Sequence, residues 1–402
     1  MWRKLIGKSP RQVAQRAVQR VARRLDVDEL AFPLLDGDLA DSQVGPAADR
    51  DLPGPVAAAT APRGDGRRVA WLAYPPQSGS GGHTTLFRMM EACRAAGFEN
   101  TLLLYNRYGN DLAESAATVR RAWPWLQCDI AFVPERIEGF DAVVASAWST
   151  AHVAVTRTAP GTRGLYFAQD FEPFFYPRGG EYAMAEDSYR LGLRIVSLGA
   201  MVRDSIREHT GVESTMIPFG VDREVYHALP GARRRSGVLF YAKRGNDRRG
   251  YRLAILALRE FHRRHPDEPI HVYGDMAGDL DVPVIDHGSL RPSELNELYN
   301  SVVTGLALSF TNISLVAEEM LAAGAVPVVN DSPLARADLS NPHALWAPAT
   351  PAGLAGALGA AVSRLDRDAH AEQVAHSVST LSWNETGARF AGILTAELDS
   401  QR

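Results

Sequence analysis

Cysteine, long apolar runs and an excess of one charge are all scarce in this chain. Its 402 residues include two cysteines, Cys93 and Cys128, which form no Cys-x-x-Cys pair and indicate a reducing, cytoplasmic setting. No run of about 18 consecutive apolar residues occurs, so a transmembrane helix is not expected. The formal net charge of −4 gives no reason to expect nucleic acid as a partner.

Motifs of the commonest hydrolases and NTPases are missing as well. The chain has neither a Gly-x-Ser-x-Gly nucleophile elbow nor a Walker-type phosphate loop. His83 and His152 follow strand-like segments and could line a cleft, but together with His287 they show no metal-ligand spacing. The sequence therefore predicts no bound metal.

The composition fits an enzyme with two hydrophobic cores. Hydrophobic residues make up 46% of the chain and charged residues 22%, and the length favours two domains plus extensions. Short apolar strands alternate with helical stretches, which predicts βαβ units and parallel sheets. Strands are expected at residues 69–74, 101–105, 130–133, 142–145, 164–168 and 195–198, then at 238–242, 271–273, 284–285, 305–309 and 326–329. Helices are expected at residues 83–96, 251–264, 292–300 and 315–323.

Five segments follow from these patterns. They are a basic amphipathic segment (1–35), a linker rich in Gly, Pro, Ala and Asp (36–68), an α/β domain (69–235), a second α/β domain (236–380) and a final helical segment (381–402). The Asp36-Gly-Asp38 triplet lies in the linker and follows no strand, so we do not interpret it as a metal site.

The basic segment permits two interpretations. Residues 1–25 carry eight basic side chains and no acid, with apolar residues at helical spacing on one face. Such a helix can lie on an anionic membrane surface, or it can pack as a solvated helix against the body of the protein. It is not expected to be a secretory signal, because no apolar run follows the charges.

A glycine-rich loop follows the first predicted strand. Residues 75–82 read Pro-Pro-Gln-Ser-Gly-Ser-Gly-Gly, with three glycines in the last four positions. Glycine lets a backbone approach a ligand closely, although many strand-to-helix turns are rich in glycine for local reasons. Gly81, Gly82 and His83 are therefore candidates for the wall of a cleft.

Two carboxylates follow the predicted strand at 164–168. Asp170 and Glu172 lie in an aromatic and proline-rich run, at the carboxyl end of a strand where open α/β sheets bind ligands. Phe171 and Tyr189 are aromatic neighbours that could pack on the apolar face of a sugar while the acids meet its hydroxyls. The alternative is that these rings only cover the core.

A basic turn follows the predicted strand at 238–242. Four residues separate Lys243 from Arg248, and four also separate Arg244 from Arg249. Cations clustered after a strand suit an anionic ligand. The alternative is a solvated basic turn.

The stretch 309–329 reads as a strand end, a polar loop, a helix and another strand. The helix opens near Ser314 and Leu315 and ends at Gly324. Such a unit aims backbone N–H groups and the positive end of a helix dipole at whatever lies above the sheet, which suits a phosphate. Glu319 would lie on the second turn, within reach of vicinal hydroxyls such as those of a ribose.

This stretch resembles the nucleotide-sugar site of GT-B glycosyltransferases of family 4. Their signature has two glutamates eight residues apart, a small-residue helix, a glycine and a strand that carries proline; Glu319, Gly324 and Pro327 match it. The earlier glutamate falls at Thr311 and is absent. The Thr-Asn-x-Ser-Leu-Val sequence found instead resembles the WsaF-like rhamnosyltransferases, as does the run around Asp170.

The resemblance implies a fold and a set of site residues. The fold is α/β, with two Rossmann-like doubly wound domains facing each other across a cleft, and the last helix crosses back onto the first domain. Catalytic roles are implied for Asp170, Glu172, Lys243 and Arg248. Donor binding is implied for Lys243, Arg248, Arg249, Thr311, Asn312, Ser314, Leu315 and Glu319. The acceptor side would include Gly81, Gly82, His83, Phe171 and Tyr189.

The implied function is transfer of a sugar, with retention, onto a growing bacterial surface glycan. The expected donor is dTDP-L-rhamnose and the acceptor a glycan or lipid-linked glycan, with no metal or other cofactor required and a cytoplasmic location at the inner face of the cell membrane. Two alternatives stay open. One is a GT-B enzyme that uses a UDP- or GDP-sugar. The other is a catalytically silent protein that binds a glycan or a nucleotide, which the missing acid at Thr311 favours.

Overall fold

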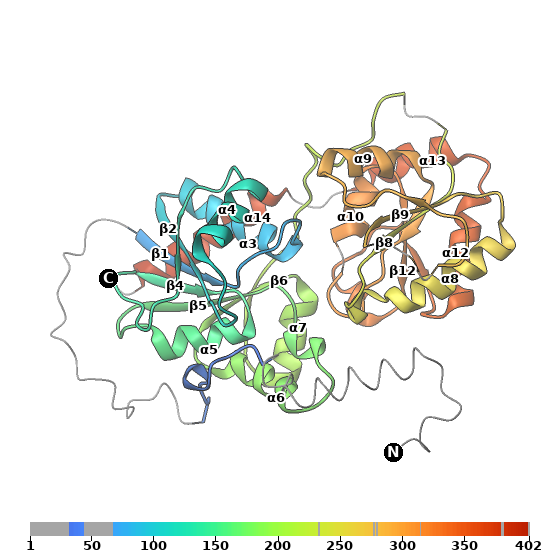
Figure 1. The fold of residues 1–402 in the computed structure, drawn as a ribbon. Coiled ribbons are helices and arrows are strands. Elements are labelled where there is room, and N and C mark those ends of the chain that lie inside the picture. Colours follow the sequence, from blue (N-terminus) through green and yellow to red (C-terminus); the bar gives the residue numbers. More distant parts are fainter. Residues whose placement is uncertain are drawn as a thin grey trace, which may run out of the picture.

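The computed structural model describes residues 32–43, 67–231, 234–275, 278, 280–313, 315–378 and 382–400. Two sheets, each with helices around it, form two lobes (Figure 1). The basic segment 1–25 and Ser314 lie outside the described residues, so the structure does not test the predictions made for them.

The first domain is built on a seven-stranded parallel sheet with the order β3-β2-β1-β4-β5-β6-β7. Its strands are β1 (Arg67–Ala73), β2 (Phe98–Leu104), β3 (Asp129–Phe132), β4 (Ala142–Ala145), β5 (Arg163–Ala168), β6 (Arg194–Leu198) and β7 (Thr215–Ile217). Its helices are α3 (Gly81–Ala95), α4 (Leu112–Ala122), α5 (Trp148–Arg157), α6 (Gly180–Asp187) and α7 (Ala200–Thr210). The strand order reverses between β1 and β4, which is where doubly wound sheets open a crevice for a ligand.

Both faces of this sheet are covered. Along β1, Val69 and Trp71 belong to the core beneath α3, whereas Ala70 and Leu72 belong to the core beneath α5, because successive side chains point to opposite faces. All four residues of β4 are buried. A nearly continuous apolar strand of this kind is typical of a parallel sheet with helices on both sides.

The second domain repeats the scheme with a six-stranded parallel sheet in the order β10-β9-β8-β11-β12-β13. Its strands are β8 (Val238–Ala242), β9 (Ile270–Gly274), β10 (Ile285–Asp286), β11 (Thr304–Leu306), β12 (Val326–Asn330) and β13 (Leu345–Ala347). Its helices are α8 (Tyr251–Arg264), α9 (Pro292–Ser301), α10 (Leu315–Ala322), α11 (Pro333–Arg336), α12 (Pro351–Val362) and α13 (Arg367–His376). The predicted α/β class with two doubly wound parallel sheets is confirmed.

The last helix, α14 (Trp383–Asp399), packs on the first domain (Figure 1). The Phe390 ring centroid lies 5.4 Å from that of Trp71 and 5.2 Å from that of Phe167. An ideal Cβ at Gly387 would stand 2.6 Å from the Cβ of Ala92 on α3, so the close approach of the two helices needs glycine there. The chain thus crosses between the domains twice.

The start of the predicted linker belongs to the first domain, and the linker prediction was wrong for it. Asp36–Asp38 forms a 3-10 turn, and the Asp38 side chain is buried. Arg157 donates to both Asp38 carboxylate oxygens, at 2.6 and 2.7 Å, and the Tyr105 hydroxyl donates to Asp38 Oδ2 at 2.6 Å. Burial of an acid is tolerable because a cation and a hydroxyl satisfy it, and no metal is needed.

Candidate functional site

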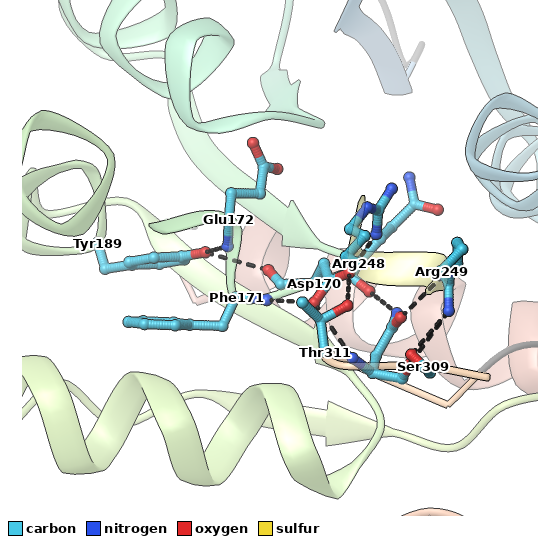
Figure 2. A network of polar contacts seen from close by, with 10 residues as sticks. Asp170, Phe171, Glu172, Tyr189, Arg248, Arg249, Ser309 and Thr311 are labelled. Carbon is cyan, nitrogen blue, oxygen red and sulfur yellow. Dashed lines mark hydrogen bonds and ion pairs between the residues drawn. The ribbon is translucent and has the colours of Figure 1, made fainter. Parts of the chain in front are cut away.

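Three loops from the carboxyl ends of strands meet between the domains (Figure 2). Gln169 and Asp170 follow β5 in the first domain. The basic turn follows β8, and residues 307–313 lead from β11 toward α10 in the second domain. The carboxyl ends of parallel strands share one edge of a sheet, so side chains distant in sequence converge there.

Asp170 lies at the centre of this meeting point and is 4% exposed. Its Oδ2 accepts from Arg248 Nη1 at 2.6 Å and from the Thr311 hydroxyl at 2.9 Å. Its Oδ1 accepts from the Phe171 N–H at 3.0 Å and from the Asn312 N–H at 3.4 Å. A carboxylate of the first domain is therefore held by charged and neutral donors of the second.

Arg248 and Lys243 have different surroundings. The Arg248 guanidinium carbon stands 4.2 Å from the centroid of the Phe175 ring, so the ion pair with Asp170 lies against an aromatic face. Phe175 is 39% exposed and borders solvent. Lys243 is exposed at the start of the same turn. The structure thus brings Arg248, but not Lys243, to Asp170.

Arg249 is directed into its own domain. Its Nη1 donates to Ser309 Oγ at 2.8 Å and to the Asn312 carbonyl at 3.3 Å, and its Nη2 donates to Asn312 Oδ1 at 3.2 Å (Figure 2). Burial, together with the neighbouring charge of Arg248, lowers the pKa of Arg249 to about 10. The guanidinium stays charged at neutral pH and fastens the loop that follows β11.

Glu172 is close to Asp170 in sequence but faces another way (Figure 2). Its Oε2 accepts from the Trp148 N–H at the start of α5 at 3.0 Å, and its Oε1 accepts from the Tyr166 hydroxyl at 3.3 Å. Burial raises the pKa of Glu172 to about 7. Glu172 is therefore placed to cap a helix beneath the site and does not meet Arg248.

The prediction that Phe171 and Tyr189 line a cleft was wrong. Both side chains are buried, and Phe171 stacks between Tyr189 and His209 at centroid distances of 5.4 and 4.9 Å. The Tyr189 hydroxyl accepts from the Glu172 N–H and donates to the Asp170 carbonyl, each at 3.1 Å. These rings support the bend that carries Asp170, because burying them stabilises the fold more than exposing them to a cleft would.

The glycine loop lies beside the same strand end. An ideal Cβ at Gly82 would stand 3.8 Å from Gln169 Oε1, and Gly81 opens α3 next to it. His83 Nδ1 lies 2.7 Å from Ser80 Oγ and its Nε2 lies 3.0 Å from the Tyr74 carbonyl oxygen. Burial lowers the pKa of His83, so the ring is neutral and fixed to its own loop.

The other two histidines noted in the sequence have local partners elsewhere. His152 lies between the Ala40 N–H and the Met184 carbonyl oxygen, each 3.2 Å from a ring nitrogen. His287 Nε2 lies 3.0 Å from His271 Nδ1. Within the described ranges, no group of three or more His, Cys, Asp or Glu side chains is arranged to hold a metal ion.

Glu319 lies on α10 at a small pocket where the domains join. Its Oε2 accepts from the Tyr299 hydroxyl at 3.3 Å, and burial raises the pKa of Glu319 to about 7. Arg88 of α3 lines the same pocket, donates to Asp222 at 3.1 Å and covers the Trp383 ring at 5.0 Å. The pocket is lined by Arg88, Gly220, Val221, Asp222, Tyr226, Leu315, Glu318, Glu319 and Trp383.

The sequence analysis did not predict Arg88 as a residue of this pocket, although its sequence context gives an indication. Arg88 interrupts the apolar run Leu86-Phe87-Arg88-Met89-Met90 in a predicted helix. A lone cation among buried positions indicates a partner across an interface. Asp222 and Trp383 come from the two segments that join the domains, and nothing in their local sequence points to the pocket.

Comparison with known proteins gives matches to a domain family and to a curated protein. Residues 236–359 match the family described as WsaF, C-terminal domain. A 270-residue stretch is 32% identical to the O-antigen biosynthesis protein RfbC of Myxococcus xanthus. That stretch covers 63% of this chain but 20% of RfbC, so the chain spans about a fifth of the length of this relative.

Solved structures match over both domains. The structure of Anabaena Alr3699/HepE in complex with UDP and glucose has a TM-score of 0.60 and 12% identity, and covers 82% of this chain and 100% of its own. The structure of WaaG, a glycosyltransferase involved in lipopolysaccharide biosynthesis, has a TM-score of 0.54 and 16% identity, and covers 81% and 99%. The expected GT-B fold is thereby confirmed.

Proposed function

We propose that this chain, which has the GT-B fold and carries a WsaF-type C-terminal domain at residues 236–359, transfers a sugar from a nucleotide donor onto a bacterial surface glycan. The observation that carries the proposal is the position of Arg248. Its guanidinium reaches Asp170 of the first domain, which also accepts from Thr311 in the loop that leads into α10 of the second domain. A leaving diphosphate in this place would meet a cation and backbone N–H groups, and an acid would stand opposite.

The donor diphosphate would bind to the second domain. Arg248 and Lys243 would supply positive charge, and α10, which begins at Leu315, would direct backbone N–H groups at the diphosphate. Thr311 and Asn312 bond to Asp170 and Gln169, so they would position the loop that precedes this helix. Glu319 would accept hydrogen bonds from hydroxyls of the donor at the pocket beside Arg88. Breaking the glycosidic bond concentrates negative charge on the diphosphate, where these groups stabilise it.

The acceptor would approach from the first domain, beside Asp170 and the loop of Gly81, Gly82 and His83. Asp170 can accept a hydrogen bond from the attacking hydroxyl and hold it near the anomeric carbon. In the structure Arg248 pairs with Asp170. Because the same guanidinium serves the carboxylate and the diphosphate, donor binding would release Asp170 for the acceptor. Retention of configuration would follow if the departing diphosphate takes the proton from the same face.

We propose dTDP-L-rhamnose as the donor. The WsaF-type domain supports this choice, and so does the replacement of the earlier glutamate by Thr311, since a deoxyribose offers fewer hydroxyls to acids. The O-antigen relative supports a surface glycan as the acceptor. A UDP-sugar is the competing donor, because HepE holds UDP and glucose on a similar fold.

Calorimetry with dTDP, UDP and GDP tests the donor site. The proposal predicts that at least one nucleoside diphosphate binds to the full chain and that dTDP binds most tightly. Tighter binding of UDP or GDP would show that the donor is a UDP- or GDP-sugar, and the proposed transferase function would still stand. If none of the three binds at millimolar concentration, a nucleotide-sugar function is contradicted.

A further inference from the structure

Asn312 and Thr311 are the side chains through which the loop after β11 bonds to the first domain. Asn312 Nδ2 donates to the Gln169 carbonyl oxygen at 2.7 Å, and the Asn312 backbone N–H donates to Asp170 Oδ1. Both acceptors follow β5, so Asn312 and its neighbour Thr311 fix where the loop stands relative to the Asp170 carboxylate.

Arg249 determines which way the Asn312 amide faces. A guanidinium has donors and no acceptor, so the Asn312 atom that faces Arg249 Nη2 at 3.2 Å must be the oxygen. The amide nitrogen is then left to point at Gln169. If the amide were reversed, two donors would face each other on one side and two oxygens on the other.

The loop is anchored from a second direction as well. Asn330, at the end of β12, accepts from the Ser309 N–H at 2.7 Å and donates to the Ser309 carbonyl oxygen at 2.6 Å. Arg249 Nη1 bonds to Ser309 Oγ and to the Asn312 carbonyl oxygen, so it spans the loop from one end to the other. The fork geometry of arginine suits several acceptors in one plane, and lysine cannot replace it.

We propose that Arg249 is a positioning residue, which holds the Asn312 amide and the loop at residues 309–312 so that this loop closes on Gln169 and Asp170 of the other domain. This inference rests on the proposed function. It assigns separate roles to the two arginines of the basic turn. Arg248 faces Asp170 and serves the donor, whereas Arg249 faces inward and has both terminal nitrogens bonded to the loop. Arg249 therefore acts on transfer through Asn312 and not through the diphosphate.

Kinetics of Arg249→Lys, Asn312→Ala and the double variant test this assignment. Misplacing a catalytic loop costs up to about 100-fold in rate. We expect kcat to fall about 10- to 100-fold in each single variant, and dTDP affinity to stay within about threefold. The double variant should be no slower than the slower single variant, since both changes break one connection. Arg252→Lys, an exposed arginine on α8, is the matched control and should behave as the wild type.

A second variant guards against loss of folding on substitution of the half-buried Arg249. Asn312→Asp keeps an oxygen for Arg249 but removes the donor to Gln169, and it should lower kcat in the same way. The inference is overturned if Arg249→Lys weakens dTDP binding as much as Arg248→Ala does, if the Arg249 and Asn312 effects multiply, or if Asn312→Asp keeps wild-type kcat. Absence of nucleotide binding by the wild type would instead contradict the proposed function.

Discussion

Two neighbouring arginines have different roles because their side chains point to different domains. Arg248 and Arg249 follow each other on a 3-10 turn (Asp247–Arg249), yet the first crosses to Asp170 and the second turns back to Ser309. The sequence predicted a basic pair with a spacing of four residues, and it favoured Lys243 with Arg248 without fixing where Arg249 points. Only the path of the turn decides that, because successive side chains leave the chain in different directions.

At the residue scale, Arg248→Ala should weaken dTDP binding more than Lys243→Ala does. Loss of one charge-assisted contact costs about 1.5–3 kcal/mol, which corresponds to about a 10- to 150-fold higher Kd. Lys243 is exposed, so its contact is screened by solvent and its loss should cost less. Calorimetry with dTDP at fixed ionic strength measures both. Equal, unchanged affinities in the two variants would show that the diphosphate does not bind here.

Glu172 gives a pH-dependent prediction. Its pKa of about 7 in the folded protein lies above the usual value of 4.5 because burial penalises the charged form. The folded state therefore binds more protons than the unfolded state between about pH 4.5 and 7, and stability falls as pH rises through this window. Glu172→Gln replaces the titratable carboxyl group with an amide, whose oxygen can still accept from the Trp148 N–H.

The measurement is the thermal midpoint of both proteins from pH 5 to pH 8. The wild type should lose stability relative to Glu172→Gln as pH rises, by about 3 kcal/mol at most for a shift of this size. A constant difference between the two proteins across this range would show that Glu172 does not titrate as its surroundings indicate.

At the scale of elements, the sequence predicted the central strands well. It did not predict which aromatic side chains are buried in the core and which face a cleft. β4 and β8 have the predicted bounds, since runs such as Ala-Val-Val-Ala and Val-Leu-Phe-Tyr-Ala are apolar throughout and end at polar turns. The edge strands β7 and β13 have three residues each and were missed, because so short a run carries little periodicity. Phe171 and Tyr189 were assigned to a cleft, since sequence does not tell a ring beneath a loop from a ring upon it.

The return of α14 to the first domain makes a prediction of its own. Phe390→Ala removes a buried ring that packs on Trp71 and Phe167, and such a truncation costs about 3–5 kcal/mol of unfolding free energy. Arg389→Ala, at the exposed neighbouring position, should change stability by less than about 0.5 kcal/mol. Urea unfolding of both variants gives the comparison. Similar midpoints would indicate that α14 contributes little to the first domain.

At the scale of the molecule, each domain has a carboxylate that accepts hydrogen bonds from the other domain. Asp170 of the first domain is held by the second, and Asp338, which follows α11 in the second, accepts from the N–H groups of Ala200 at 2.6 Å and Met201 at 3.0 Å. Those groups open α7 of the first domain, so Asp338 caps a helix across the interface. The two crossing segments also pair with each other at Val221 and Ser382. A ligand that competes for Asp170 or Arg248 would therefore replace one of these contacts between the domains.

The basic segment 1–25 concerns the whole molecule too, although it lies outside the described residues. Among the residues that the structure describes, no helix is long and apolar enough to cross a membrane. We propose that the eight basic residues hold the enzyme at an anionic membrane surface near a lipid-linked acceptor. Co-sedimentation with anionic vesicles should be strong and should weaken with salt. Equal binding by a chain that starts at Phe32, which keeps the part of the amino-terminal region that packs on the first domain, would show that this segment does not bind the membrane.

We propose above all that the site formed by Asp170 and Arg248 transfers a sugar. The most direct measurement incubates the full chain with dTDP-L-rhamnose, UDP-glucose and GDP-mannose, each with a glycan acceptor, and detects the released nucleotide and the mass of the extended acceptor. We expect transfer by the wild type and greatly reduced transfer by Asp170→Asn. The dTDP affinity of Asp170→Asn should equal or exceed that of the wild type, because Arg248 is no longer paired with a carboxylate. Transfer by Asp170→Asn at the wild-type rate would contradict the proposal, since the carboxylate at the centre of the site would then have no part in the reaction.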